Sequence, residues 1–338
     1  MVTLAVGSWA GPHDGRTPVE RKIAEITSRA AQSGGPVTAI VLTAGNAASD
    51  NGHFAGTATP DRPAAFDWLM WPADPTANKI EIWYAGPALL VVTLAAPGGD
   101  AEVTIAPGGT AAIVVGGRLV GIGDHVPAAS GDLTRVRLSL HPPFFPSDLA
   151  RTPDGRLGWR IRCAVPAGAA SVAIHAWVER DDGELERSSV APHDNRSTLS
   201  GIAAAHGAVV VAAFDHQDPF APWRDDPLSG RGPLPWASSM AAAVPHVAAP
   251  GHRIVAARSK TTGYTQVSGT SPAGALVAGA LAVVMGRALR VAGRDPGRRR
   301  ALLQRAIHAV AGGRNADWSA SRGHGAVDIA AAVREVTQ

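Results

Sequence analysis

The chain has 338 residues, of which 46% are hydrophobic and 17% are charged. This balance excludes intrinsic disorder or a coiled coil along the whole length. The single cysteine, Cys163, excludes a disulfide framework within the chain and a cysteine-rich zinc site. The formal net charge of +3 is small, and no aromatic platform accompanies the basic residues at 287–305, so we expect a solvated helix surface there and no nucleic-acid partner.

No apolar run reaches the roughly 18 residues of a membrane span without interruption, and the longest, at 275–286, is too short. We therefore expect no membrane partner. The N-terminal sequence MVTLAVGSWAGPHDG lacks the basic and apolar regions of a signal peptide, which predicts a cytoplasmic chain as it stands. A further segment upstream of Met1 would allow an extracellular location.

The N-terminal region predicts an α/β arrangement. Residues 2–6 form a short apolar strand pattern. Residues 18–33 predict a helix, because Pro18 suits a first turn and apolar residues recur at helical spacing. Residues 37–45 are a nearly continuous apolar run, as in a central parallel strand. Strand, helix and strand together predict a right-handed crossover unit.

The middle of the chain predicts a different architecture. Short alternating strands, separated by turn signals such as Pro-Gly-Gly, extend from about 64 to 190. An antiparallel sandwich or jelly roll has this pattern. The clearest strands are expected at 79–85, 88–96, 101–106, 111–117, 135–141, 158–165 and 171–180.

The last third of the chain returns to an α/β pattern. Strands are predicted at 208–214 and 252–258, and helices at 271–291, 301–311 and 327–336. We therefore predict two domains. They are a discontinuous α/β domain of residues 1–60 and 198–338, and a β-sandwich inserted at 64–190.

Two short segments carry side chains suited to catalysis. Ser271 stands at a predicted loop-to-helix junction, where its hydroxyl is clear of the backbone and first-turn amides can donate to a developing negative charge. Asn46 follows a predicted parallel strand, at the sheet edge where α/β proteins bind ligands. Asn46 and the amide of Ser271 would together form a two-donor oxyanion hole.

Each of these residues also has a plain structural explanation. Ser is a favoured N-cap residue, and for a lone Ser before a helix that explanation is the more frequent one. An Asn that follows Gly is typical of a turn. The order and the contexts of the two segments together, rather than either residue alone, favour the catalytic interpretation.

The sequence SGTSPAGALVAGALAVVMG (268–286) resembles the serine segment of the subtilisin-like serine peptidases, the subtilases. VLTAGN (41–46) resembles the strand that ends in their oxyanion asparagine. The resemblance covers about 1–60 and 198–338, and the sandwich resembles jelly-roll insertions of some bacterial subtilases. Further segments that match in the family's order are VTLAVG (2–7), VPHVAAPGHRIVAA (244–257) and GHGAVDIAAAV (323–333).

The resemblance implies a fold and a set of site residues. The fold would be α/β, a partial subtilisin-like doubly wound parallel sheet interrupted by an all-β, jelly-roll-like antiparallel sandwich. Ser271 would be the nucleophile and Asn46 the oxyanion donor. The substrate-binding residues would be an edge strand of Ala5, Val6 and Gly7 and a pocket wall of Thr43, Ala44 and Gly45.

The sequence departs from the family in the proton-handling part of the site. Subtilases carry an Asp in an Asp-Thr/Ser-Gly turn and a His in a His-Gly-Thr-His motif, and neither motif occurs here. We expect His13, His53, His206 and His324 to be surface or turn residues rather than substitutes. Without a base beside Ser271 Oγ, proton transfer is lost, so we expect little or no peptidase activity from this chain alone.

Three interpretations stay open. The first is a serine endopeptidase that acts on a peptide or protein substrate, with the missing Asp and His either on a neighbouring chain or upstream of a misplaced start. The second is a non-catalytic pseudo-peptidase that binds through the sandwich, and the third is a decaying gene product without a stable fold. We expect no cofactor and no metal site, and we interpret Asp181-Asp182 as a solvated acidic turn.

Overall fold

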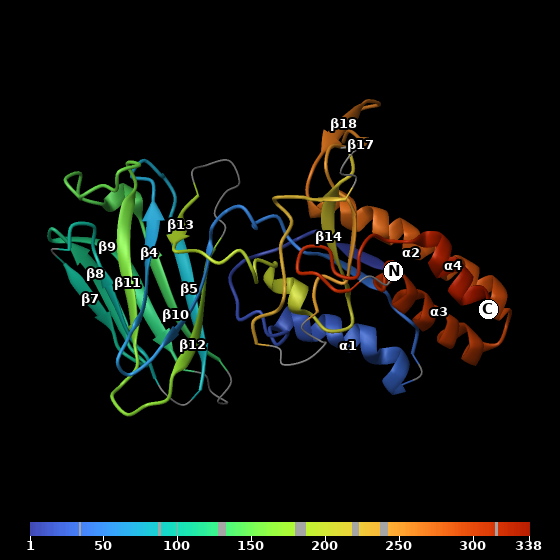
Figure 1. The fold of residues 1–338 in the computed structure, drawn as a ribbon, viewed down its shortest axis with the longest axis horizontal. Coiled ribbons are helices and arrows are strands. Elements are labelled where there is room, and N and C mark those ends of the chain that lie inside the picture. The colour runs from blue at the N-terminus through green and yellow to red at the C-terminus, as the bar shows by residue number, and fades with distance from the viewer. Residues whose placement is uncertain are drawn as a thin grey trace. The chain divides into compact units, whose positions relative to one another are not determined.

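The structure of the chain is a computed structural model, which describes residues 1–33, 35–86, 89–99, 101–127, 133–179, 187–217, 223–236, 243–314 and 317–338. It divides into two compact units, which are described separately. The α/β unit consists of Met1–Gly7, His13–Ser49 and Arg196–Gln338, and the β unit consists of Ser8–Pro12 and Asp50–Asn195. The chain is therefore mixed α/β with several sheets (Figure 1).

The α/β unit is built on a five-stranded sheet. Its strands follow the order β1-β2-β14-β15, and β16 also pairs with β14. The pairings of β1 with β2, β2 with β14 and β14 with β16 are parallel, whereas β15 is antiparallel. The strands are β1 (Val2–Leu4), β2 (Ile40–Thr43), β14 (Val209–Asp215), β15 (Arg224–Asp225) and β16 (Val247–Pro250).

Helices pack against both faces of this sheet, because its strands are apolar on both sides. Alternate residues face opposite sides, so Val41 and Val211 lie in one core cluster while Leu42 and Val210 lie in another. The first cluster includes residues of α2, α3 and α4, and the second includes residues of α1 and the short helix η2. These helices are α1 (Pro18–Ser33), η2 (Gly201–Ala204), α2 (Thr270–Ala292), α3 (Pro296–Ala311) and α4 (Ile329–Thr337).

The start of α1 shows how local sequence sets an element's boundary. Thr17 N donates to Glu20 Oε2 at 2.9 Å, and Glu20 N donates to Thr17 Oγ1 at 3.5 Å. This reciprocal pair satisfies two donors that the helix cannot satisfy itself, and Pro18 at the first helical position needs no such partner. The predicted helix at 18–33 is therefore found with the same bounds.

Helix α2 has 23 residues and lies against the parallel sheet. Gly274 allows this approach, because a Cβ at that position would lie 2.9 Å from Thr43 Cγ2. By length and composition α2 could also cross a membrane, which differs from the expectation that no segment of this chain is long enough. Its buried residues pack in the core of the unit, so this fold gives its apolar composition a structural explanation.

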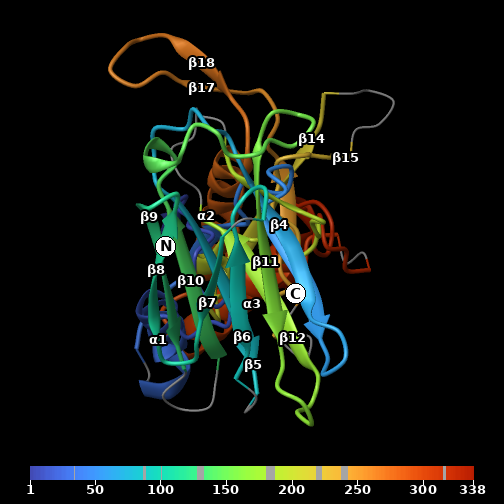
Figure 2. The same cartoon turned by 90° about the vertical axis from the view of Figure 1, so that its left-hand side faces the viewer.

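The β unit consists of two antiparallel sheets (Figure 2). One has the order β3-β12-β5-β10-β9-β8 and the other has the order β13-β4-β11-β6-β7. The elements of this unit are β3 (His53–Ala58), β4 (Ala64–Met70), β5 (Asn78–Ala85), β6 (Val91–Ala95), β7 (Glu102–Ile105), β8 (Thr110–Val115), β9 (Arg118–Val126), β10 (Leu133–Leu140), η1 (Pro142–Phe144), β11 (Leu157–Ala164), β12 (Val172–Val178) and β13 (Ser189–Ala191).

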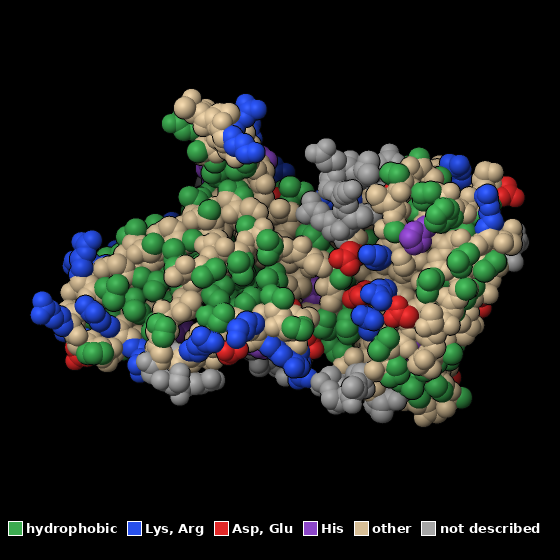
Figure 3. All heavy atoms as spheres, turned by 180° about the vertical axis from the view of Figure 1, so that it is seen from behind, with side chains coloured by type: hydrophobic (Ala, Val, Ile, Leu, Met, Phe, Trp, Pro, Cys, Tyr) green, Lys and Arg blue, Asp and Glu red, His purple; other side chains and the backbone are tan. Residues whose placement is uncertain are grey.

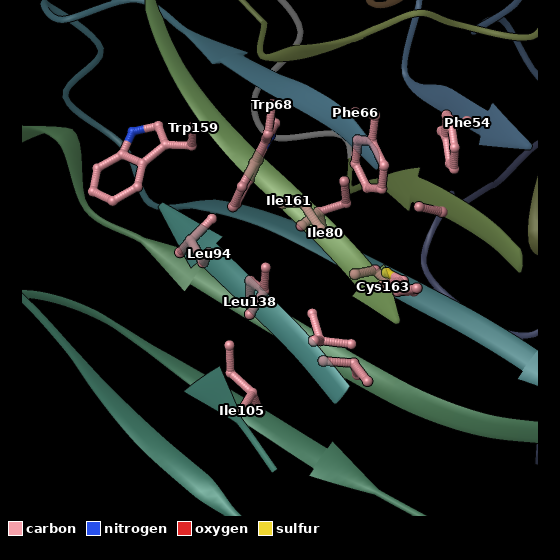
Figure 4. Close-up of a cluster of buried hydrophobic side chains, with 14 of the residues drawn as sticks. Phe54, Phe66, Trp68, Ile80, Leu94, Ile105, Leu138, Trp159, Ile161 and Cys163 are labelled. Atoms are coloured by element: carbon pink, nitrogen blue, oxygen red, sulfur yellow. The ribbon is translucent and has the colours of Figure 1, made fainter. Parts of the chain in front are cut away.

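Both sheets of the β unit contribute side chains to one hydrophobic core (Figure 4). Trp68 and Trp159 from one sheet and Ile80 and Leu138 from the other are all at most 1% exposed. Cys163 lies in the same core, and burial raises the pKa of its thiol to about 12. The alternation that predicted strands in this region is thus the alternation between core and surface.

The structure corrects one expectation about these elements and supplies the pairing partner of a predicted strand. Residues up to 60 were expected in the α/β domain, but β3 pairs antiparallel with β12 and belongs to the β unit, whose long segment begins at Asp50. The strand expected at 252–258 is found, but outside the parallel sheet. β17 (Ile254–Ala257) pairs with β18 (Tyr264–Val267) in a separate hairpin, because a short apolar run indicates extended backbone but does not choose its partner.

Candidate active site

Ser271 is the second residue of α2, and its side chain is exposed. The preceding N-cap residue is Gly269, with a φ of 121°. The first amides of an α-helix have no partner inside the helix. Within the described part of the chain, the amide of Ser271 has no hydrogen-bond partner, so it is available to an incoming acceptor.

Asn46 follows β2 and contacts the start of α2. Its Oδ1 accepts hydrogen bonds from Thr270 N at 2.8 Å and from Thr270 Oγ1 at 2.9 Å. Thr270 Oγ1 in turn accepts a hydrogen bond from Gly45 N at 3.2 Å. Because Oδ1 is held in this way, Nδ2 is the atom of the Asn46 amide that remains to donate. The structure therefore brings Asn46 to the residue next to Ser271.

Gly269 makes room for Asn46. A Cβ at position 269 would lie 2.7 Å from Asn46 Nδ2 and 3.1 Å from Asn46 Cγ, which no real side chain could tolerate without a shift. Gly269 N also donates to Gly251 O at 2.8 Å, which fixes the loop before the helix. A φ of 121° is one that residues other than glycine rarely adopt.

Thr270 is the residue of this arrangement that sequence reasoning missed. It is 1% exposed and links Asn46 to the first turn of α2 through both its backbone and its hydroxyl. The signal available in the sequence is weak: a single hydroxyl residue between Gly269 and Ser271 at the start of a helix. Its partner is more than 200 positions away in the chain, so local pattern could not supply it.

Ala5, Val6 and Gly7, expected as a substrate-binding edge strand, lie just beyond the end of β1. All three are exposed and have no strand assignment. A Cβ on Gly7 would lie 2.4 Å from Ser200 Oγ, so this position is closely packed on one side. Their role toward a substrate stays a prediction.

Thr43, Ala44 and Gly45, expected as a pocket wall, are buried. The backbone of Ala44 forms hydrogen bonds within the unit. Ala44 N donates to Val211 O at 2.9 Å, and Ser200 N donates to Ala44 O at 2.8 Å. None of the three lines the groove beside Ser271. Their role as a pocket wall also stays a prediction.

A groove of about 570 Å³ lies beside Ser271, between the β17–β18 hairpin and the first turns of α2. Its lining is mostly apolar and contains no charged side chain. The lining residues are Ile254, Val255, Ala256, Val267, Ser268, Ser271, Pro272, Ala275 and Leu276. The nucleophile candidate therefore borders an apolar surface rather than a titratable group.

Two of the four histidines considered as substitutes, which were expected at the surface or in turns, are buried. His13 is 1% exposed, and its Nε2 lies 3.1 Å from Leu199 O. His53 is 2% exposed, and its Nε2 lies 3.0 Å from His175 Nδ1. Backbone and side-chain partners inside their own units explain this burial, because a buried polar group requires a hydrogen bond.

The other two histidines are accessible. His206 lines a cavity of about 640 Å³ between α1 and α3, and His324 is partly exposed and donates its backbone N–H to His246 O at 2.8 Å. Among all the residues that the structure describes, no histidine forms a hydrogen bond with Ser271.

His246 is the histidine whose titration the fold changes most clearly. It immediately precedes β16, and its Nδ1 accepts a hydrogen bond from Val210 N at 2.9 Å. Burial, together with the neighbouring His324, lowers the pKa of His246 to about 4. An Nδ1 that accepts a backbone hydrogen bond must be unprotonated, so the geometry and the lowered pKa agree.

Metal binding has no support in the described ranges. There, no group of three or more His, Cys, Asp or Glu side chains could hold an ion. Asp181-Asp182, interpreted from the sequence as an acidic turn, lies outside the described residues.

Comparison with known proteins finds a family model that matches the segment carrying Ser271. Residues 186–325 match the subtilase family, Peptidase_S8. The resemblance to subtilases is therefore confirmed, and the match supports a peptidase at the level of the family. No curated protein sequence matches this chain.

A solved structure extends the comparison to the whole fold. The Clostridium perfringens CspB protease is similar over 99% of this chain with a TM-score of 0.75, at 18% sequence identity. This chain spans 66% of that protein, just under two thirds of its length. The prenylagaramide maturation protease PagA and the self-cleaved protease domain of PatA each match 42% of this chain at 23% and 20% identity, covering 47% and 46% of their own chains. Their TM-scores of 0.31 and 0.30 are too low to support an argument.

Proposed function

We propose that this chain supplies the nucleophile and the oxyanion-binding groups of a subtilisin-like serine endopeptidase, and that by itself it has little or no peptidase activity. The observation that carries this proposal is the pair of hydrogen bonds by which Thr270, the neighbour of Ser271, holds Asn46. The family match of residues 186–325 supports it, because that segment contains Ser271.

In the proposed reaction, Ser271 Oγ attacks the carbonyl carbon of a peptide bond. The electron pair of the carbonyl moves to its oxygen, which becomes an oxyanion in a tetrahedral intermediate. Asn46 Nδ2 and the amide of Ser271 donate hydrogen bonds to that oxyanion. Such preorganised donors stabilise developing charge and are each worth roughly 10²–10³ in rate.

The step that the chain cannot complete is proton transfer. The serine hydroxyl must lose its proton as it attacks, and the leaving amine must gain one. No Asp-Thr/Ser-Gly or His-Gly-Thr-His motif occurs in the 338 residues, and no described histidine hydrogen-bonds to Ser271. A polypeptide that supplies a histidine and its orienting carboxylate is therefore the partner that we propose, besides the peptide or protein substrate.

The remaining parts of the proposal concern the scaffold. We assign the α/β unit to a partial doubly wound sheet of the subtilisin type, with Ala5, Val6 and Gly7 as the substrate edge and Thr43, Ala44 and Gly45 behind the pocket wall. We assign the β unit to an inserted jelly-roll-like sandwich. The chemistry proposed needs no cofactor.

A second candidate is a pseudo-peptidase that binds through the β unit. The observation that favours it is that Ser271 has an apolar groove beside it and no described base. In this case Ser271 and Asn46 would be the remaining residues of an active site that no longer catalyses hydrolysis. The two candidates predict different behaviour toward transition-state analogues.

The first test is labelling of the purified chain with a fluorophosphonate probe at neutral pH, followed by intact-mass analysis. We expect a labelled fraction near that of the Ser271→Ala control over a time in which a complete serine peptidase is fully labelled, and no cleavage of fluorogenic peptides. Stoichiometric labelling of Ser271 in the isolated chain would refute the proposed inactivity.

The second test separates the two candidates. A peptidyl boronic acid forms a tetrahedral adduct with a serine hydroxyl and resembles the transition state. If Ser271 and Asn46 are a working half-site, its binding should weaken by about tenfold or more in Ser271→Ala and in Asn46→Ala. Binding that both variants retain, or no binding at all, would favour the pseudo-peptidase.

A further inference from the structure

The cavity between α1 and α3 lies at the other end of the parallel sheet from Ser271 and Asn46. Thr38, which precedes β2, and Gly207, which precedes β14, both line it, whereas Asn46 follows β2. Its volume of about 640 Å³ is within the range of small-molecule pockets, about 300–1,000 Å³. The proposed peptidase reaction uses no residue of this cavity.

Four side chains that line the cavity carry hydrogen-bond donors. Arg21 comes from α1, Thr38 from the segment before β2, and Gln304 and His308 from α3. Within the described ranges, none of these four side chains has a hydrogen-bond or ion-pair partner. Three separate segments of the chain therefore offer donors to an acceptor placed in the cavity.

The charge around the cavity is positive. Glu25 is the one acidic residue of the lining, and its carboxylate is already paired. Lys22 Nζ lies 2.8 Å from Glu25 Oε2, and Arg29 Nη2 lies 2.6 Å from Glu25 Oε1. These two partners lower the pKa of Glu25 to about 2, so its charge is present at neutral pH and is compensated by two cations.

Helix α3 adds to this positive charge. It carries four arginines and no acidic residue. Figure 3 shows Lys and Arg side chains along the lower margin of the α/β unit, which is the side on which Figure 1 shows α1 and α3. Such a concentration of one sign of charge attracts anions and raises their local concentration.

The lining also has an apolar part. Ala24 on α1, Val37 before β2 and Ile307 on α3 line the cavity, and all three are partly exposed. Covering apolar surface of this kind removes it from water and favours binding. A ligand that uses the whole cavity therefore needs an anionic group with several acceptors and an apolar group beside it.

We propose that the cavity between α1 and α3 binds a small organic phosphate monoester. The phosphate group carries a charge of about −1.5 to −2 at neutral pH and has three acceptor oxygens that point in different directions. Donors from three segments suit this tetrahedral group, whereas one guanidinium can already satisfy both oxygens of a planar carboxylate. The organic group would cover Ala24, Val37 and Ile307.

The test is a phosphorus NMR titration of phenyl phosphate with the purified full chain, at neutral pH and low ionic strength. We expect saturable one-to-one binding. Inorganic phosphate should bind about tenfold more weakly, because it leaves the apolar part of the lining uncovered. Benzoate, followed by proton NMR, should also bind about tenfold more weakly, because it has two acceptor oxygens instead of three.

Substitutions locate the bound ligand. Arg21→Gln and His308→Gln should each weaken the binding of phenyl phosphate by about tenfold, because each removes a donor to a charged acceptor. The matched control is Arg299→Gln, which removes the same charge from α3. Arg299 does not line the cavity, and its Nε donates to Gly293 O at 2.6 Å. We expect the control to change the affinity by less than about twofold.

Four results would overturn the proposal. The first is the absence of a phosphorus shift, and the second is binding that Arg21→Gln and His308→Gln leave unchanged. In the third, Arg299→Gln weakens binding as much as Arg21→Gln, which would mean that any basic surface attracts the anion. In the fourth, inorganic phosphate binds as tightly as phenyl phosphate, which would exclude a role for the organic group. Urea midpoints of the variants, compared with that of the natural chain, show whether a loss of binding reflects a loss of folding.

Discussion

The β unit buries several of its largest side chains completely, whereas the α/β unit leaves part of its longest helix exposed. In the β unit, Trp68, Phe66 and Tyr84 are each 0% exposed, and two sheets share the core that holds them. In the α/β unit, one side of α2 is equally buried, but Val283 is 58% exposed. The two units therefore differ in what fills their cores, large aromatic side chains in the β unit and mainly Ala and Val in the α/β unit, whereas exposed apolar residues occur in both; Ile122 on β9 is 50% exposed.

This difference shows how the stability of each unit arises. An apolar side chain stabilises a fold only when a partner removes it from water. The β unit supplies both sheets of its core from one continuous run of sequence, so its core is self-contained. The α/β unit supplies a sheet with helices on both faces, and its two core clusters draw on segments that lie far apart in the sequence.

The largest change in stability is expected from a substitution in the core of the β unit. Trp68→Ala should lower the free energy of unfolding by about 3–5 kcal/mol, because it leaves a large cavity and removes the partner of Ser188 Oγ, which Trp68 Nε1 contacts at 3.2 Å. Urea unfolding followed by circular dichroism measures the change. Trp71→Ala, at a partly exposed position just after β4, is the matched control and should cost less than half as much. Equal costs would contradict the idea of a self-contained core.

The next largest effect is expected in how the stability of the α/β unit depends on pH. His246 has a pKa of about 4 in the folded chain, below its ordinary value of 6.5, so the unfolded chain takes up the proton first as pH falls. The stability that depends on neutral His246 is complete above about pH 6.5 and is lost as pH falls through 4, by at most about 3 kcal/mol. Urea midpoints measured across this range test the prediction.

The control for this titration is His246→Asn. Its Oδ1 can accept the hydrogen bond that Val210 N donates, but the amide does not titrate. We expect the variant to lose less stability than the natural chain between pH 6.5 and 4. Parallel curves for the two proteins would show that His246 is not the group responsible.

Smaller changes in stability, of opposite sign, are expected when two glycines at the start of α2 and within it are replaced by alanine. Gly269→Ala should destabilise the chain by about 1–3 kcal/mol, because of the φ of 121° and the contact that its Cβ would make with Asn46 Nδ2. Gly279→Ala should stabilise it by about 0.5–1 kcal/mol, because Ala is the better helix former and the site is open. Thermal unfolding of both variants measures this, and the same sign for both would contradict the geometry described here.

Much of the fold could be predicted from local sequence, but the choice of strand partners could not. Pro18 and the apolar spacing predicted α1 with its bounds, and the structure adds the capping pair of Thr17 and Glu20. By contrast, β17 is a short apolar run, but among the described strands it pairs with β18 alone, whereas β16 takes the place in the parallel sheet. Extended conformation is a local property, whereas pairing depends on residues far away in the chain.

The candidate site shows the same limit. Ser271 and Asn46 were identified from their contexts and from the family resemblance, and the structure brings Asn46 to the start of α2. Thr270, which joins them, was not identified, because its role depends on an oxygen contributed by a segment more than 200 residues earlier. The groove beside Ser271 could not be predicted either, since it requires the β17–β18 hairpin to lie beside α2.

The most direct test of the central claim, that Ser271 and Asn46 form a half-site without a base, is the pH profile of fluorophosphonate labelling from about pH 6 to about pH 9. We predict a slow rate that rises about tenfold per pH unit without a plateau, because hydroxide must replace the missing base, and a further loss of roughly 10²–10³ in Asn46→Ala at every pH. A plateau above about pH 7, the mark of a histidine base within the chain, or an Asn46→Ala variant that reacts as fast as the natural chain, would contradict it.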